Sequence, residues 1–399
     1  MDLDDLRYLQ SPEGRALLAE LATEPLTPDT HLSIAARLRQ RTPPERARAA
    51  LELAMLRLQA GRKFSRAAEM FFTRTGLEQA TAEPVAAYRA GRFAAAGQNL
   101  VADLGCGIGS DALALAQAGA AVVAIDKDRM RAAIAQANAA ALGLTERVLP
   151  VVADLTALPP LPVDAFFYDP ARRTESGARA AAARRLRSVE EYQPPLSLID
   201  RWRPVVGGGA IKVSPGIDYR ELPPEVETEF ISQDGEVKEA VLWHGTLRSE
   251  ATRRATLLPG GSTLTNRSGP DVGALSPPLG YLYEPDGAVI RAHLVAQLGA
   301  LLNAAQIDPA IAYLTAGEIQ PTLFARAYQI NDYFPFQLKR LRAYLRERHV
   351  GRVTIKKRGS PLDPDELRQA LRLRGDNHAV VFLTQVMGEP MTLIGEDAA

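Results

Sequence analysis

The stretch Asp103-Leu104-Gly105-Cys106-Gly107-Ile108-Gly109 decides how this chain folds. It closes the short apolar run 100–104 and precedes an Ala-rich segment with helical character. Glycine lets the backbone turn tightly and approach a ligand without a clash from a Cβ atom. An acidic side chain at the end of a strand can also hold an ammonium group. The stretch therefore predicts a strand, a ligand-binding turn and a helix, with Asp103, Gly105, Gly107 and Gly109 contacting the ligand.

Apolar runs and helical segments alternate downstream of this turn. The runs are 121–126, 148–153, 165–168 and 210–213. Alternation of this kind predicts a parallel sheet covered by helices on both faces. Further along, 227–233 and 237–243 flank Asp234-Gly235, which is a hairpin signal. The fold class is therefore predicted as α/β, with a Rossmann-like sheet of parallel strands that ends in an antiparallel hairpin.

Two further acids follow the second and third predicted strands. Asp126 comes seventeen residues after Gly109, at a point where a carboxylate accepts hydrogen bonds from ribose hydroxyls. Asp154 follows the next run and is placed to accept a hydrogen bond from an adenine amino group. With Asp103, both would lie at the carboxyl ends of parallel strands, where open α/β sheets bind ligands.

The glycine turn allows three interpretations. Taken alone, it is weak evidence and could be only a tight connection between a strand and a helix. A dinucleotide site is the second interpretation, but here the acid precedes the glycines, the spacing is G-x-G-x-G, and Asp154 recurs in register. The combined pattern favours S-adenosylmethionine (SAM) over NAD. A parallel sheet that ends in a hairpin is also the layout of SAM methyltransferases rather than of nicotinamide dehydrogenases.

With DLGCGIG at 103–109, Asp126 and Asp154, the chain resembles class I SAM-dependent methyltransferases. Further motifs resemble a bacterial methyltransferase family that carries a C-terminal THUMP-like domain and is distantly similar to trimethylguanosine synthases. These motifs are FFT at 71–73, GLEQAT at 76–81, YRA and RF within 88–93, and YDPARR at 168–173. The resemblance implies SAM as cofactor, a ferredoxin-like or THUMP-like α+β domain near the C-terminus, and RNA as partner.

The loop after the fourth predicted strand is the candidate catalytic segment. In amino-group methyltransferases this strand ends in Asp or Asn, two prolines and an aromatic residue, which orient the target amine. Here Asp169 and Pro170 match, so the Asp169 carboxylate and the Pro170 carbonyl are predicted to orient the acceptor. Ala171 and Arg172 depart from the pattern, which leaves base stacking at this position in doubt. Tyr168 could supply the stacking instead, or Phe71 or Phe72, although core packing is the alternative for all three.

The length of 399 residues predicts two or three domains. We expect a helical region at 1–95, a methyltransferase domain at 96–258, a linker rich in Gly, Pro, Ser and Thr at 259–279, and an α+β domain at 280–399. The last of these has a strand–helix–strand–strand pattern near its end, which fits a small α+β sandwich.

Composition excludes several classes of protein. The single cysteine, Cys106, rules out an intramolecular disulfide and a cysteine-ligated cluster, and its place inside the glycine turn argues against a nucleophile. The histidines lack ligand-like spacing, so no metal site is predicted. Neither a signal peptide nor a run of eighteen apolar residues is apparent, and we expect a soluble, cytoplasmic protein that does not enter the membrane.

Acidic and basic residues balance at 47 each, which argues against a generally basic nucleic-acid binder. Basic residues nevertheless gather at 37–66 and 339–358, each of which holds nine, and in the loop after the fourth strand. Solvated helix faces and surface ion pairs are the alternatives to phosphate contacts. The substrate-binding candidates are Tyr168, Arg172, Arg173, Lys356, Lys357 and Arg358.

Three functions remain open from these residues. The first is SAM-dependent methylation of RNA at an amino group of a base, with guanine among the candidates. The second is methylation of a small molecule or a protein, with the C-terminal domain covering the pocket. The third is a non-catalytic RNA-binding protein that retains SAM as a structural ligand. The oligomeric state, the RNA and the methylated atom stay open.

Overall fold

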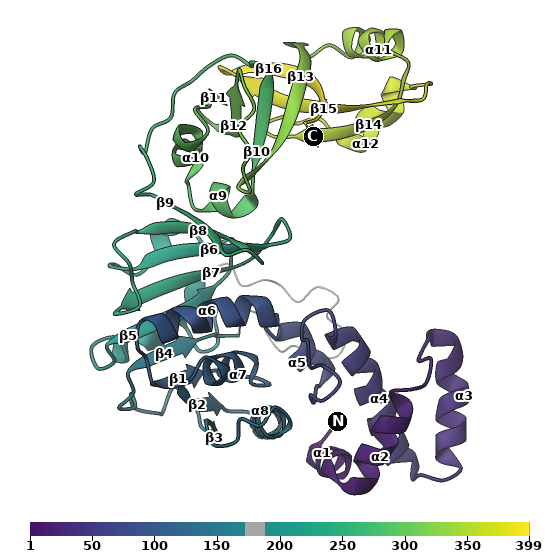
Figure 1. Cartoon of the computed structure of the whole chain (residues 1–399), viewed down its shortest axis with the longest axis vertical. Coiled ribbons are helices and arrows are strands. Elements are labelled where there is room, and N and C mark those ends of the chain that lie inside the picture. Colours follow the sequence, from purple (N-terminus) through teal and green to yellow (C-terminus); the bar gives the residue numbers. More distant parts are fainter. Residues whose placement is uncertain (172–187, 399) are drawn as a thin grey trace. The chain divides into compact units, whose positions relative to one another are not determined.

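The computed structural model describes residues 1–171 and 188–398 (Figure 1). It contains two compact units, one made of 1–226 with 240–249 and the other of 227–239 with 250–399. This division differs from the expected boundary at 258, because the strand that precedes the hairpin turn groups with the later residues. Within the described ranges, no helix is both long enough and apolar enough to span a bilayer.

The first part of the chain is helical, as the sequence indicated. The helices are α1 (Leu3–Gln10), α2 (Pro12–Leu21), α3 (Pro28–Arg39), α4 (Pro44–Ala60), α5 (Arg74–Gln79) and α6 (Glu83–Ala95). Asp2, Ser11 and Thr27 cap the first three helices through their side chains. Apolar residues at three- and four-residue steps bury one face of each helix, as Leu17, Leu18 and Leu21 do in α2.

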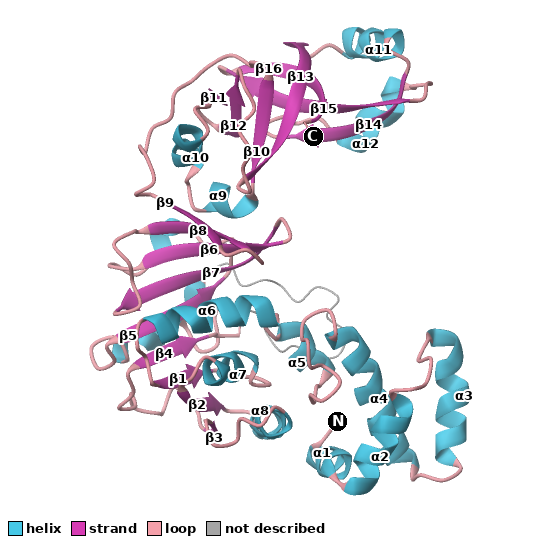
Figure 2. Ribbon diagram, viewed as in Figure 1, coloured by secondary structure: helices cyan, strands magenta, loops and turns pink. Residues whose placement is uncertain are grey.

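A nine-stranded sheet follows, in the order β3-β2-β1-β4-β5-β7-β6-β8-β9 (Figure 2). Its elements are β1 (Leu100–Leu104), α7 (Ser110–Gln117), β2 (Ala121–Asp126), α8 (Arg129–Ala141), β3 (Val148–Val152), β4 (Ala165–Tyr168), β5 (Gly208–Val213), β6 (Glu227–Gln233), β7 (Glu236–Gly245), β8 (Arg253–Leu258) and β9 (Ser262–Thr265). Strands β1 to β5 are parallel, and β7 runs antiparallel to β5. This confirms the predicted parallel sheet that ends in a hairpin.

The turn between β6 and β7 has the backbone conformation that the sequence predicted. Asp234 and Gly235 both adopt positive φ, at 54° and 77°, which is the conformation that a two-residue hairpin turn requires. The sheet then continues further than expected. Strand β8 pairs in parallel with β6, and β9 pairs with β8, so the segment 259–279 contains a strand instead of being only a linker.

The C-terminal residues form a second, seven-stranded sheet in the order β11-β12-β10-β13-β16-β15-β14. Its elements are β10 (Tyr281–Pro285), α9 (Gly287–Arg291), α10 (Val295–Leu301), β11 (Ala305–Asp308), β12 (Ile311–Ala316), β13 (Ala325–Pro335), α11 (Leu338–Glu347), β14 (Val350–Lys357), α12 (Pro364–Leu371), β15 (Asn377–Val386) and β16 (Glu389–Asp397). The predicted strand–helix–strand–strand order is present as β14, α12, β15 and β16.

Both faces of this second sheet are covered. Leu341 and Leu345 of α11 pack with Leu367 and Leu371 of α12 in one apolar cluster. On the other side, Phe382 makes edge-to-face contacts with two tyrosines, Tyr313 and Tyr328. The remaining short helices, 3₁₀ turns at 189–191, 196–201 and 219–221, lie between β4 and β6 in the sequence.

Candidate cofactor and acceptor site

The glycine turn lies at the carboxyl end of β1, and two of its glycines are required by their surroundings. Gly105 and Gly109 have positive φ, at 96° and 89°. A Cβ atom on Gly105 would lie 2.9 Å from the carbonyl oxygen of Asp169, and one on Gly109 would lie 3.1 Å from the Cβ atom of Ala135. The amides of Gly105 and Cys106 both donate to the Ile125 carbonyl at 2.9 Å. The turn therefore contacts both β2 and the end of β4, and these contacts hold it in place.

Gly107 differs from the other two glycines. In the described part of the chain, a Cβ atom at this position would meet no atom within 4 Å. Its amide donates to the Asp126 Oδ2 atom at 3.0 Å, while the Asp128 amide donates to Oδ1 at 2.9 Å. Asp126 thus orients the turn at the carboxyl end of β2. Its role toward ribose hydroxyls stays a prediction.

Asp103 is the most unusual acid of the site. It lies in β1 with no exposed surface, and neither carboxylate oxygen has a hydrogen-bond partner among residues 1–171 and 188–398. Burial, together with nearby Asp111 and Asp169, raises the pKa of its carboxyl group well above the usual range. A buried carboxylate without a partner is costly, so this position is suited to a cationic ligand. The ammonium group of SAM is such a ligand, and the residues present fit the expected cofactor.

Asp154 lies two residues after the end of β3 and is exposed. Its Oδ1 atom accepts hydrogen bonds from the Thr156 amide at 2.9 Å and the Thr156 hydroxyl at 2.7 Å. These hydrogen bonds lower the pKa of the Asp154 carboxyl group. The side chain is therefore held ionised at the same edge of the sheet as Asp103 and Asp126, and its contact with adenine stays a prediction.

Asp169 follows β4, and its carboxylate has a partner that sequence reasoning missed. The Lys212 Nζ atom of β5 donates to Asp169 Oδ2 at 2.7 Å and to the Thr81 hydroxyl oxygen at 2.9 Å. Lys212 is buried, whereas the Asp169 side chain is about one-fifth exposed. The available signal was a single charged residue in the run Ala210-Ile211-Lys212-Val213. Pro170 is also buried beside Asp169.

A buried polar network extends from Thr81 toward α6. The Thr81 hydroxyl donates to Asp111 Oδ2 at 3.1 Å, and Asp111 also forms an ion pair with Arg89. The Arg89 guanidinium lies over the Phe167 ring, 4.4 Å from its centre. The motifs at 76–81 and 88–93 therefore supply side chains that connect the N-terminal helices with the end of β4.

The aromatic residues that we considered for base stacking are buried. The Tyr168 ring has no exposed surface, and its hydroxyl donates to the Pro194 carbonyl at 2.6 Å. Burial also raises the pKa of the Tyr168 hydroxyl. Phe71 and Phe72 are at most 6% exposed. Burial of the ring within the sheet favours the core-packing alternative for Tyr168, and its contact with substrate stays a prediction.

Phe71 belongs to a segment that is fixed against the glycine turn through its backbone. The Asn138 side chain of α8 accepts from the Phe71 amide at 2.6 Å and donates to the Phe71 carbonyl at 3.2 Å. The Asn138 side-chain amide also donates to the Ile108 carbonyl at 3.0 Å. Asn138 is fully buried, so one side chain holds the N-terminal segment and the turn together.

The basic candidates fall into three groups. Arg172 and Arg173 lie outside the described residues. Lys356 donates to Glu284 at 2.5 Å, and Arg358 lies 3.9 Å from the same carboxylate. Burial alone would lower the pKa of the Lys356 ammonium, but hydrogen bonds to Glu284 and Tyr328 outweigh it and raise the pKa. Glu284 of β10 therefore pairs with both cations of β14, which favours the ion-pair alternative, and their contact with substrate stays a prediction.

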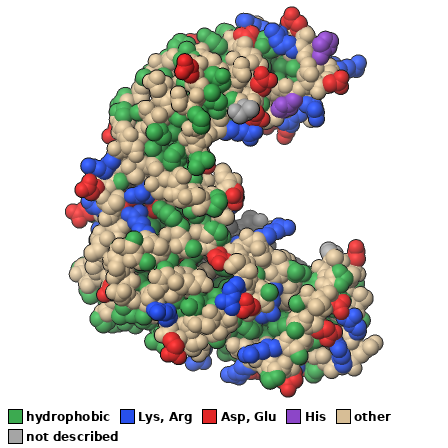
Figure 3. Space-filling model, in the orientation of Figure 1, with side chains coloured by type: hydrophobic (Ala, Val, Ile, Leu, Met, Phe, Trp, Pro, Cys, Tyr) green, Lys and Arg blue, Asp and Glu red, His purple; other side chains and the backbone are tan. Residues whose placement is uncertain are grey.

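Lys357 and α11 present exposed charge instead. Lys357 is exposed and donates only to the Leu362 carbonyl among the contacts of the described chain. In α11, Lys339, Arg340 and Arg346 are exposed, while Leu341 and Leu345 face the core. Figure 3 shows Lys and Arg side chains at the end of this unit that carries α11, with acidic side chains among them.

Two aromatic rings support cations on this surface. The Arg340 guanidinium lies 4.3 Å from the centre of the Phe334 ring, and the Arg348 guanidinium lies 3.6 Å from the centre of the Tyr344 ring. Such contacts hold a long side chain in place while leaving its edge available for hydrogen bonds. We call Lys339, Arg340, Arg346 and Arg348 the basic face of α11.

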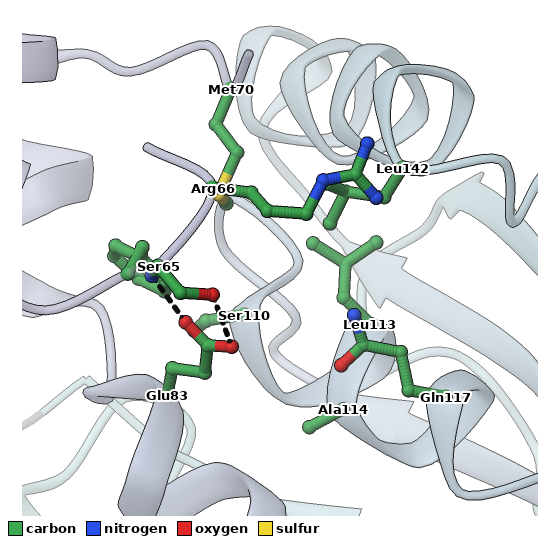
Figure 4. A pocket seen from close by; sticks show the side chains of 10 residues that line it. Ser65, Arg66, Met70, Glu83, Ser110, Leu113, Ala114, Gln117 and Leu142 are labelled. Carbon is green, nitrogen blue, oxygen red and sulfur yellow. Dashed lines mark hydrogen bonds between the residues drawn. The ribbon is translucent and has the colours of Figure 1, made fainter. Parts of the chain in front are cut away.

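A small cavity lies beside α7 (Figure 4). Ser110 and Leu113 of α7 line it together with Phe64, Met70 and Glu83. The Ser65 hydroxyl donates to Glu83 at 2.8 Å at its rim. None of Asp103, Asp126, Asp154 or Asp169 lines this cavity, so it is not the predicted cofactor site. Across the described ranges, no cluster of three or more His, Cys, Asp or Glu side chains has a metal-binding arrangement.

Similar proteins have been identified for most of the chain. A methyltransferase domain model matches residues 101–189, a THUMP domain-like model matches 325–397, and a domain of unknown function (DUF8688) matches 2–60. Uncharacterized SAM-dependent methyltransferases from two strains of Mycobacterium tuberculosis are each 37% identical over 329 residues, which span 80% of this chain and 85% of the relative. The crystal structure of a candidate methyltransferase from Porphyromonas gingivalis W83 has the same fold. Its TM-score is 0.75 at 22% identity, over 96% of this chain and 98% of that one.

Proposed function

Because the chain belongs to the SAM-dependent methyltransferases, we propose that it transfers a methyl group to an amino group of a base in RNA. The observation that carries the acceptor chemistry is the position of Asp169. Its carboxylate follows β4, its backbone carbonyl lies against the glycine turn, and it interacts electrostatically with the carboxyl group of Asp103, which has no hydrogen-bond partner among the described residues. A cofactor held through Asp103 and an acceptor held through Asp169 would therefore meet at one edge of the sheet.

SAM, when bound, supplies an electrophilic methyl group on a sulfonium. The residues of the chain have three tasks in this proposal. Asp103 holds the cofactor's ammonium group, and Asp126 and Asp154 hold its nucleoside part. Asp169 and the Pro170 carbonyl accept hydrogen bonds from the acceptor's N–H groups, which aims the nitrogen lone pair along the axis of displacement. The bound cofactor would supply the methyl group to this nitrogen, and the proton that the nitrogen loses would pass to solvent.

RNA is the proposed acceptor because of the C-terminal unit. A THUMP domain-like match covers 325–397 and includes α11. The basic face of α11 is exposed, and two of its cations are supported by aromatic rings. Cations of this kind bind phosphates without reading sequence, so they would hold RNA and leave the choice of base to the region around Asp169. The cytoplasm is the proposed location of this reaction.

The test uses isotopically labelled SAM with total RNA, and protein and metabolite fractions are assayed in parallel. We expect label in RNA from the wild-type protein. Asp169→Ala should bind SAM normally but transfer no label, whereas Glu146→Gln, a change at an exposed acid of the same unit, should leave transfer intact. Label only in the protein or metabolite fraction would overturn the RNA proposal. Transfer or RNA function that survives in Asp169→Ala would overturn the catalytic role of Asp169.

A further inference from the structure

Lys212 occupies a position where a charged residue needs a specific reason. All six residues of β5 are buried, and Lys212 itself is 4% exposed. Placing an ammonium group inside a sheet is costly unless it is paired and hydrogen-bonded. Its hydrogen-bond partners Asp169 and Thr81 come from the end of β4 and from the loop between α5 and α6. The ammonium therefore joins the acceptor side of the site to the N-terminal region, 131 residues away in sequence.

We infer that Lys212 is a positioning residue, anchored by Thr81, that holds the Asp169 carboxylate in place and directs one of its oxygens toward the acceptor. The inference rests on the proposed role of Asp169 in holding an amine. Lys212 occupies Oδ2, at 2.7 Å, which leaves Oδ1 to accept an N–H from the acceptor. Asp169 is also the partly exposed member of the pair, so an acceptor can reach the carboxylate while the lysine stays enclosed.

Among the described residues, Lys212 is the cation that pairs with Asp169. Asp103 on β1 and Asp111 on α7 are buried acids that interact electrostatically, and Asp169 also interacts with Asp103. Arg89 from α6 pairs with Asp111, whereas Lys212 from β5 pairs with Asp169. A neutral side chain in place of Lys212 would leave the Asp169 carboxylate without this partner.

Thr81 restrains the Lys212 side chain. Its hydroxyl oxygen accepts from Lys212 Nζ at 2.9 Å, which limits where the Asp169 carboxylate can turn. Thr81 is itself tied to Asp111, so the anchor is rigid.

The test compares Lys212→Met, Lys212→Arg and the wild type in methyl transfer, with SAM affinity measured separately. We expect Lys212→Met to retain SAM affinity and to lose kcat by on the order of 10²-fold, since misplacement of a reacting group costs about that much. Lys212→Arg keeps a donor for Asp169 and should restore most of the lost kcat.

A Lys212→Met enzyme with the kcat of the wild type, or one that loses only SAM affinity, would overturn the inference. If Lys212→Met does not fold, Thr81→Val and Thr81→Ser test the inference instead. Thr81→Val should lower kcat with unchanged SAM affinity, and Thr81→Ser should restore kcat. Equal activity in the two variants would contradict the role of Thr81 as the anchor of Lys212. If the wild type labels a fraction other than RNA, the RNA proposal fails, and the same variants are compared on that acceptor with the same expectations. No transfer to any acceptor by the wild type would overturn both proposals.

Discussion

The carbonyl oxygen of Asp169 lies 2.9 Å from the point that a Cβ atom on Gly105 would occupy. This contact places the glycine turn after β1 directly against the candidate catalytic segment after β4. Gly105→Ala should therefore weaken SAM binding and cost about 1–3 kcal/mol in the free energy of unfolding, because the substituted residue keeps a φ of 96° as well as the clash. Calorimetric titration with SAM and thermal unfolding measure the two effects.

Gly91→Ala is the matched control for this substitution. Gly91 lies in the exposed face of α6, and an added Cβ atom there would meet no described atom within 4 Å. Alanine should stabilise the helix by roughly 0.5–1 kcal/mol without changing SAM affinity. Equal SAM affinity in Gly105→Ala and Gly91→Ala would contradict the role assigned to the turn.

Asp103→Asn should stabilise the protein without cofactor and weaken its binding of SAM. The raised pKa of Asp103 means that its stabilising contribution is complete below the unfolded pKa of about 4 and is lost as pH rises toward the folded value. The gain in Tm of Asp103→Asn over the wild type should therefore grow as pH increases from 4. Loss of a charged hydrogen bond of about 1.5–3 kcal/mol should weaken SAM binding roughly 10- to 100-fold.

The pH dependence of SAM binding provides an independent check on Asp103. Because the empty site favours the protonated acid and an ammonium ligand requires the carboxylate, binding should release a proton. Wild-type affinity for SAM should rise with pH across the acidic range, and Asp103→Asn should abolish that rise. A variant with unchanged Tm and unchanged SAM affinity would show that another group holds the ammonium.

Asn138→Leu should loosen the segment that contains Phe71 from the glycine turn. The substitution leaves the Phe71 amide and the Phe71 and Ile108 carbonyls without their buried partner, at about 1–3 kcal/mol for each unsatisfied group. Thermal unfolding should show a clear loss of stability. Gln136→Ala changes an exposed residue of the same helix and should have little effect. If both variants unfold alike, Asn138 does not hold these two segments together.

If the basic face of α11 binds RNA, the affinity for RNA should depend on salt concentration through these residues. Arg340→Ala combined with Arg348→Ala should weaken RNA binding and reduce the slope of log affinity against log salt by about 1.4, the value for two contacts with single-stranded phosphates. Lys356→Ala should leave that slope unchanged, since Lys356 is paired with Glu284. A slope that responds to Lys356→Ala but not to the arginine pair would place the RNA contact on β14 instead.

Local patterns explain which parts of the site were predictable from sequence. The glycine turn, the acids after β1 to β4 and the Asp234-Gly235 hairpin each depend on residues that are adjacent in the chain, and the predicted sheet is confirmed. The role of Lys212 rests on its contacts with Thr81 and Asp169, which lie 131 and 43 residues away in the sequence. No local sequence pattern indicates contacts between residues so far apart. A lone charge within an apolar strand was the one available signal.

The expectations for which the structure favours an alternative share a related cause. Tyr168 follows the pattern of a substrate-facing aromatic, but its ring is enclosed by residues from distant elements. Lys356 and Arg358 form a basic run in sequence, yet β10 brings Glu284 between them. Strand β9 falls in a segment rich in Gly, Pro and Ser, and its pairing with β8 organises residues that local composition assigned to a linker.

The most direct measurement is the chemical identity of the product. Total RNA is incubated with the protein and isotopically labelled SAM, digested to nucleosides and analysed by mass spectrometry. Acceptor orientation by Asp169 and Pro170 leads us to expect the label on an exocyclic nitrogen of one base, absent with Asp169→Ala. Label on a ribose oxygen or a base carbon, or label confined to protein or metabolites, would contradict methyl transfer to an amino group of RNA.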